Sequence, residues 1–146
     1  MDLKKFNQEA LNAVYKTAQI GLSSISNVLE KVTQTDFKEE LTSEYEGYEK
    51  FASALATFIS ENEYELKDVN PMKKAFMWTS IKLNTLTDSS SNHVAELMLK
   101  GTITGIAEMQ EMINSNAKAI DENILSFAER LKSLMEKYED NLKKFL

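Results

Sequence analysis

The sequence predicts an all-α protein that folds as a single up-down four-helix bundle over residues 1–146. A chain of 146 residues has the size of one domain. One proline and four glycines are too few for the turns of a β-sandwich, a barrel or a doubly wound sheet. Apolar residues recur at alternating steps of three and four over long stretches, as in helices that bury one face. Long helices joined by short connections pack antiparallel.

The first helix is expected over residues 2–32, followed by a short polar joint at 33–35. Its apolar stripe consists of Leu11, Tyr15, Ala18, Leu22, Ile25, Leu29 and Val32. The second helix begins near Asp36, which forms a pattern like a capping box with Glu39 three residues later. Every member of its periodic stripe is apolar except Glu44. The stripe consists of Phe37, Leu41, Glu44, Tyr48, Phe51, Leu55 and Phe58.

The third helical region begins after a joint at 61–69, where Asn70-Pro71 is typical of an N-cap followed by proline at the first helical position. A straight helix over 71–114 would be much longer than its neighbours. The polar run at 87–92 offers a break, so we expect one helix to about Leu86 and another from about Asn92 to Asn114. A single kinked helix is the alternative.

The last helix is expected over residues 119–146. Asp121 and Glu122 lie in its first turn and Lys143 and Lys144 near its last turn, which is the distribution that the helix dipole favours.

Composition excludes several classes of function. The net charge of −6 argues against a nucleic-acid partner, which requires clustered basic residues. No apolar stretch is long enough for membrane insertion, and the N-terminus lacks a signal-peptide core, so we expect a cytoplasmic protein. The absence of cysteine excludes an Fe–S cluster, and the absence of phosphate-binding motifs argues against a nucleotide.

A helical bundle can still hold a metal inside. The di-iron carboxylate pattern takes a Glu from each of two helices and a Glu-x-x-His from each of the other two. This chain has one histidine, His93, and no Glu-x-x-His, so a complete site of that kind is excluded.

A partial metal site remains open, and Glu44 is its first candidate. A carboxyl in an apolar stripe calls for a partner, which is a Tyr15 or Tyr138 hydroxyl, water, or a metal such as iron or another divalent ion. His93 falls on the polar arc of the 92–114 helix with Glu96, although a continuous 71–114 helix would bring it closer to the apolar stripe. Glu108 lies at the boundary of either arc. The candidate metal ligands are therefore Glu44, His93, Glu108 and Glu96.

Gly101 and Gly105 lie one turn apart on one helix face. Their small size predicts close approach of another helix, within the bundle or across a dimer, in preference to room for a ligand.

Three segments resemble a family of bacterial ferritin-like four-helix-bundle proteins whose motifs carry no assigned chemistry. They are Asn84-Thr-Leu-Thr-Asp-Ser-Ser-Ser-Asn-His93-Val-Ala-Glu96-Leu-Met-Leu-Lys-Gly101-Thr-Ile-Thr-Gly105, residues 20–27 and residues 44–51. The resemblance implies a ferritin-like bundle. It does not imply iron, because such bundles include members without a di-iron centre, and the missing Glu-x-x-His motifs put oxidase or iron-storage activity in doubt.

Two functions follow. The first is a non-catalytic bundle that acts through homo-oligomerisation by its helix faces or through a protein partner. The alternative is a degenerate carboxylate–histidine protein of the iron-binding type. We favour the first, in which the chain is not an enzyme.

Overall fold

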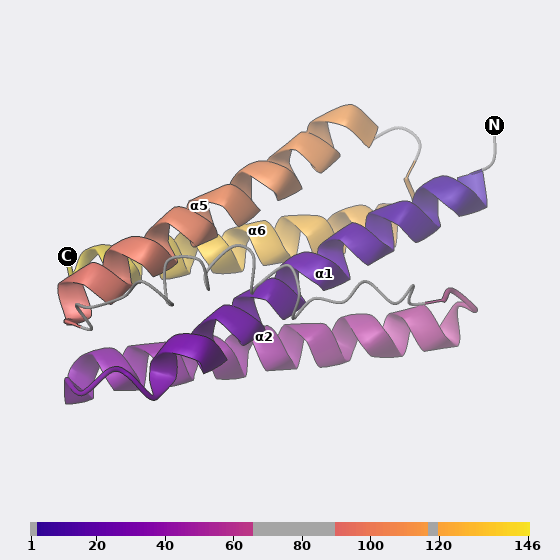
Figure 1. Cartoon of the computed structure of the whole chain (residues 1–146). Helices are drawn as coiled ribbons and strands as arrows, with labels where there is room; N and C mark the ends of the chain where they lie inside the picture. The colour runs from indigo at the N-terminus through magenta and orange to yellow at the C-terminus, as the bar shows by residue number, and fades with distance from the viewer. Residues whose placement is uncertain (1–2, 66–89, 117–119) are drawn as a thin grey trace.

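The computed structural model describes residues 3–65, 90–116 and 120–146, and within these ranges the chain is all-α (Figure 1). Its helices are α1 (Leu3–Leu29), α2 (Thr35–Glu61), α5 (Ser91–Asn116) and α6 (Glu122–Lys143). They form the four-helix bundle that the sequence predicts. None of the described helices has the length and apolar character needed to cross a membrane.

The helices pack as two antiparallel pairs, α1 with α2 and α5 with α6 (Figure 1). The predicted antiparallel packing of chain neighbours therefore holds within each pair. Helices α2 and α5 also run in the same direction (Figure 1), and residues 66–89, which separate them along the chain, lie outside the described residues.

The ends of α2 and α6 show how accurately capping can be predicted. The predicted capping box at Asp36 does not form. The N-cap of α2 is Gln34, and its side chain makes no capping bond. Asp36 Oδ1 instead accepts from the backbone N–H of Phe37 (2.9 Å). In α6, Asp121 is the N-cap itself and accepts from the backbone N–H of Asn123 (2.8 Å).

Helix α5 begins at Ser91, inside the polar run where the sequence predicts a break or a fresh start. It ends at Asn116, two residues beyond the expected end. The helix predicted to end at Leu86, and the Asn70-Pro71 start before it, lie outside the described residues.

The core is built from the predicted stripes. On α2, Phe37, Leu41, Tyr48, Phe51 and Leu55 are buried, and Glu44 is buried among them. On α1 the buried face is rotated slightly from the prediction, because Val14 and Val28 are buried while Tyr15, Leu22 and Leu29 are only partly so.

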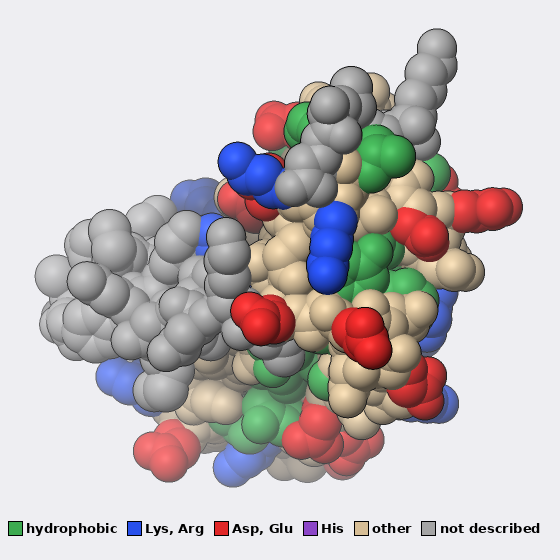
Figure 2. Space-filling model, turned by 90° about the vertical axis from the view of Figure 1, so that its right-hand side faces the viewer, with side chains coloured by type: hydrophobic (Ala, Val, Ile, Leu, Met, Phe, Trp, Pro, Cys, Tyr) green, Lys and Arg blue, Asp and Glu red, His purple; other side chains and the backbone are tan. Residues whose placement is uncertain are grey.

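On the face shown in Figure 2, acidic and basic side chains are interspersed with hydrophobic ones. Among the described residues, the large hydrophobic side chains that are most exposed are Leu3, Phe6, Ile103 and Leu146.

Candidate functional site

The candidate site is centred on Glu44, whose side chain is 1% exposed in the middle of α2. Its carboxyl forms a hydrogen bond with Glu40, one turn earlier, while Oε2 has no partner among the described residues. Burial, followed by the bond to Glu40 and the charge of that carboxylate, raises the pKa of Glu44 to about 10. At neutral pH Glu44 is therefore protonated, and its O–H donates to Glu40. Asn141 Nδ2 donates to Glu40 Oε2 from α6 (3.3 Å).

Two tyrosines pack beside this carboxyl. Tyr48 lies one turn after Glu44, and Tyr138 comes from α6; their rings meet edge to face with centroids 5.1 Å apart. Burial first, and the nearby Glu44 second, raise the pKa of both phenols. The Tyr48 hydroxyl bonds to Thr102 of α5. This bond lowers the pKa of Tyr48, against the effect of burial. Thr102 Oγ1 also lies within hydrogen-bond distance of the Met98 carbonyl (2.8 Å).

Two glycines make room for these tyrosine rings. A Cβ on Gly21 of α1 would lie 2.7 Å from Tyr48 Cζ, and a Cβ on Gly47 of α2 would overlap the Tyr138 hydroxyl. Gly47 stands three residues after Glu44, which is the histidine position of a Glu-x-x-His motif. The Tyr138 hydroxyl occupies the space that a side chain at position 47 would need.

A cavity of about 60 Å³ lies between α1 and α5, on the other side of Tyr48. Ser24 lines it with a fully buried side chain whose Oγ has no hydrogen-bond partner among the described residues. At Gly105, a Cβ would lie 2.8 Å from Met135 Sδ, so the glycine accommodates a side chain of α6. Gly101 and Gly105 also line the cavity, so the pair provides room as well as close packing.

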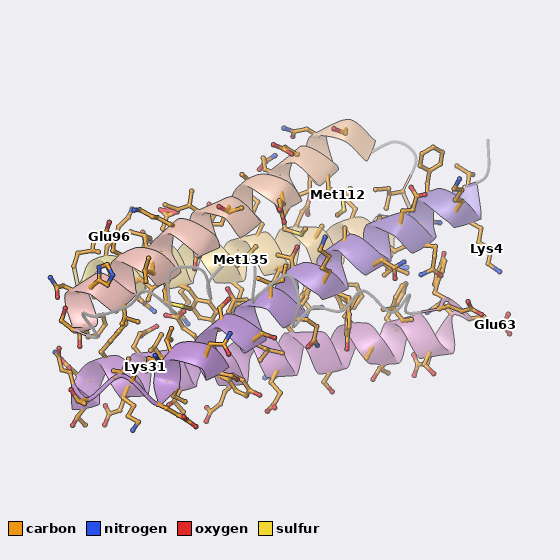
Figure 3. The ribbon with its side chains drawn as sticks, in the orientation of Figure 1. Lys4, Lys31, Glu63, Glu96, Met112 and Met135 are labelled. Atoms are coloured by element: carbon orange, nitrogen blue, oxygen red, sulfur yellow. The ribbon has the colours of Figure 1, made fainter. Side chains whose placement is uncertain are left out.

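The four predicted metal ligands do not come together. Glu44 lies in the core on α2, whereas His93, Glu96 and Glu108 lie on α5. Glu96 is exposed on the outer side of α5 and pairs with Lys100 (Nζ to Oε1, 3.0 Å), while Met135 lies inside the bundle (Figure 3).

His93 is half-buried in the first turn of α5, and Glu108 is exposed at the α1–α5 cavity. The two lie fifteen residues apart on one helix, a rise of about 22 Å, so they cannot ligate one ion. In the part of the chain that the structure describes, no group of three or more His, Asp or Glu side chains is placed to hold a metal.

The residues that do meet Glu44 are Glu40, Tyr48 and Tyr138. The predicted hydroxyl partner of Glu44 was Tyr15 or Tyr138; Tyr138 lies near Glu44, but the Glu44 carboxyl bonds to Glu40 instead. The carboxyl pair was missed, although the spacing of four residues between Glu40 and Glu44 places both on one helix face.

No protein-family model and no curated protein sequence matches the chain. Among solved structures, it is similar to the bacterioferritin-related protein from Bacteroides fragilis, described as a dodecameric thioferritin in the bacterial domain. The two are 21% identical with a TM-score of 0.74, over 99% of this chain and 86% of that chain. The likeness concerns the fold alone, and this chain therefore has a ferritin-like four-helix-bundle fold.

Proposed function

We propose that the chain is a ferritin-like bundle that assembles with copies of itself and carries no di-iron catalytic centre. The observation that carries this proposal is the set of side chains around Glu44. Tyr138 of α6 and Tyr48 of α2 fill the space beside it, with Thr102 of α5 beyond. None of these is a carboxylate or an imidazole.

The kinds of side chain present support the same conclusion. A di-iron centre is held by ionised carboxylates and neutral imidazoles from all four helices. The carboxylate that bonds to Glu44, Glu40, comes from the same helix as Glu44. The whole chain has one histidine.

The first test measures iron chemistry on the full chain, purified without an affinity tag or a chelator. We expect elemental mass spectrometry to find metal far below one ion per chain, and ferrous iron to oxidise in air no faster than in buffer alone. The matched variants are Glu44→Ala in the core and Glu49→Ala, which removes an exposed carboxylate of the same helix. Stoichiometric metal that Glu44→Ala loses and Glu49→Ala keeps would overturn the proposal.

Self-assembly is supported by the dodecameric state of the similar bacterioferritin-related protein. Native mass spectrometry of the untagged protein tests it directly. We expect a mass of at least twice the 16.6 kDa of one chain, at a whole-number multiple. A monomer at tens of micromolar concentration would contradict this part of the proposal.

The second candidate is a metal-binding bundle that uses Glu44 with Glu40 in the core, while the other predicted ligands, His93, Glu96 and Glu108, lie on α5. The observation that favours it is the unpartnered Oε2 of Glu44 beside the Glu40 carboxylate. A bound divalent cation would replace the proton that the two carboxyls share. If this candidate holds, Glu40→Gln lowers the metal content together with Glu44→Ala, and metal loading releases protons.

A further inference from the structure

The cavity between α1 and α5 has a predominantly apolar lining. Ile20 and Gly21 come from α1, Met98 and Gly105 from α5, and Met135 from α6. A ligand in this cavity would make apolar contacts with the walls and form few hydrogen bonds.

Ser24 is a polar residue in this mostly apolar lining. Its side chain is 0% exposed, it lines the cavity, and its Oγ has no hydrogen-bond partner among the described residues. The other buried hydroxyls of the lining are already engaged: Thr17 Oγ1 donates to the Ala13 carbonyl (2.9 Å), and Tyr48 bonds to Thr102. Buried polar groups are nearly always paired, so the Ser24 hydroxyl calls for a partner inside the cavity.

The size and the mouth of the cavity restrict that partner. A water molecule needs roughly 10–15 Å³ of such space, so a cavity of about 60 Å³ holds several waters or one molecule of a few non-hydrogen atoms. Among its lining residues Thr104 and Glu108 are exposed, which places the opening on their side. The Glu108 carboxylate at this opening, in a chain of net charge −6, disfavours anions.

We propose that this cavity binds a small neutral molecule that carries one hydroxyl group on a short aliphatic chain. The hydroxyl pairs with Ser24 Oγ, and the chain lies against Met98 and Met135. The site is independent of Glu44 and of any metal, so it extends the proposed function without resting on it.

The test uses n-propanol as the probe and methyl NMR of the intact protein labelled at its methionine methyls. Met98 and Met135 line the cavity, whereas Met109 is buried outside it and serves as an internal reference. We expect saturable shifts of the Met98 and Met135 methyls at millimolar propanol, with Met109 unchanged. Shifts that rise linearly without saturation, or that affect the three methyls equally, would overturn the site.

Two serines of α1 make a matched pair of variants. Ser24→Ala removes the buried hydroxyl, and Ser26→Ala removes an exposed one two residues away. We expect Ser24→Ala to weaken propanol binding about five- to tenfold, the worth of one hydrogen bond, and Ser26→Ala to leave it unchanged.

Xenon, which needs no hydrogen bond, should shift the same methyls equally in wild type and in Ser24→Ala and so shows that the variant keeps its cavity. Equal propanol affinity in wild type and Ser24→Ala, with xenon still bound, would show an apolar cavity only and would overturn the role of Ser24. Tighter binding of n-propylammonium than of n-propanol would overturn the neutral class of ligand.

Discussion

Replacing Glu44 by glutamine should stabilise the protein at neutral pH, and the gain should grow as the pH rises. Glutamine has the shape of a protonated glutamate, and its amide can donate to Glu40 as the carboxyl O–H does. It differs in having no proton to lose. The variant therefore isolates the free energy of holding that proton in the core.

The magnitude follows from the pKa of Glu44, which is about 10 in the folded protein against 4.5 ordinarily. Between these values the folded chain holds a proton that the unfolded chain has released. Stability from this group is thus fully present below pH 4.5 and falls by about 1.4 kcal/mol for each pH unit above it. At pH 7 the wild type is expected to be less stable than Glu44→Gln by about 3 kcal/mol.

Urea unfolding followed by circular dichroism, at intervals from pH 5.5 to 8.5, measures the difference between the two chains. Other titrating groups cancel in that difference, and we expect it to change by about 4 kcal/mol across the range. Glu49→Gln, which alters an exposed carboxylate of α2, is the control and should show no such trend. A Glu44→Gln variant that is less stable than wild type throughout would mean that position 44 is ionised and paired or ligated, and would refute the reasoning.

Three further substitutions test the packing and the helix ends, each by urea unfolding. Gly47→Ala should destabilise by about 2 kcal/mol, because its Cβ overlaps the Tyr138 hydroxyl, and adding Tyr138→Phe should recover most of the loss; a loss that Tyr138→Phe leaves untouched would contradict the contact. Asp121→Ala should cost about 1 kcal/mol, because the α6 N-cap loses its bond to Asn123; no loss would show that this cap is dispensable. Gln34→Ser should gain about 1 kcal/mol by supplying the capping bond that α2 lacks, and an unchanged stability would argue against a free N-cap.

The bundle could be predicted because each helix repeats its apolar positions over six or more turns. The same repetition identified Glu44, since a single carboxyl in an otherwise apolar stripe is easy to recognise. Helix ends were harder, because they depend on one or two residues: Asp36 has a capping sequence, yet its carboxylate bonds to the neighbouring Phe37 N–H.

The site itself depends on how helices are aligned, which no single stripe contains. Gly47 and Tyr138 are ninety-one residues apart, and only the alignment of α2 with α6 shows that one makes room for the other. Ser24 likewise lies outside the predicted α1 stripe, which includes Leu22 and Ile25. It is buried because α5 approaches α1 on that side.

The cost of Glu44 bears on the choice between the two proposed functions. The expected loss of about 3 kcal/mol at neutral pH would make Glu44 an unfavourable core residue where glutamine would fit. Unfavourable residues of this kind are expected at functional positions. An amide can form the hydrogen bond to Glu40, but it cannot exchange a proton and is a poor ligand for a cation. If Glu44→Gln is more stable and metal content is negligible, the carboxyl serves no structural purpose that glutamine lacks, and a role in proton exchange has to be sought in the intact protein. If the wild type is more stable than Glu44→Gln only when it is loaded with metal, then Glu40 and Glu44 are metal ligands. Tyr48 and Tyr138 would then shield that metal from solvent.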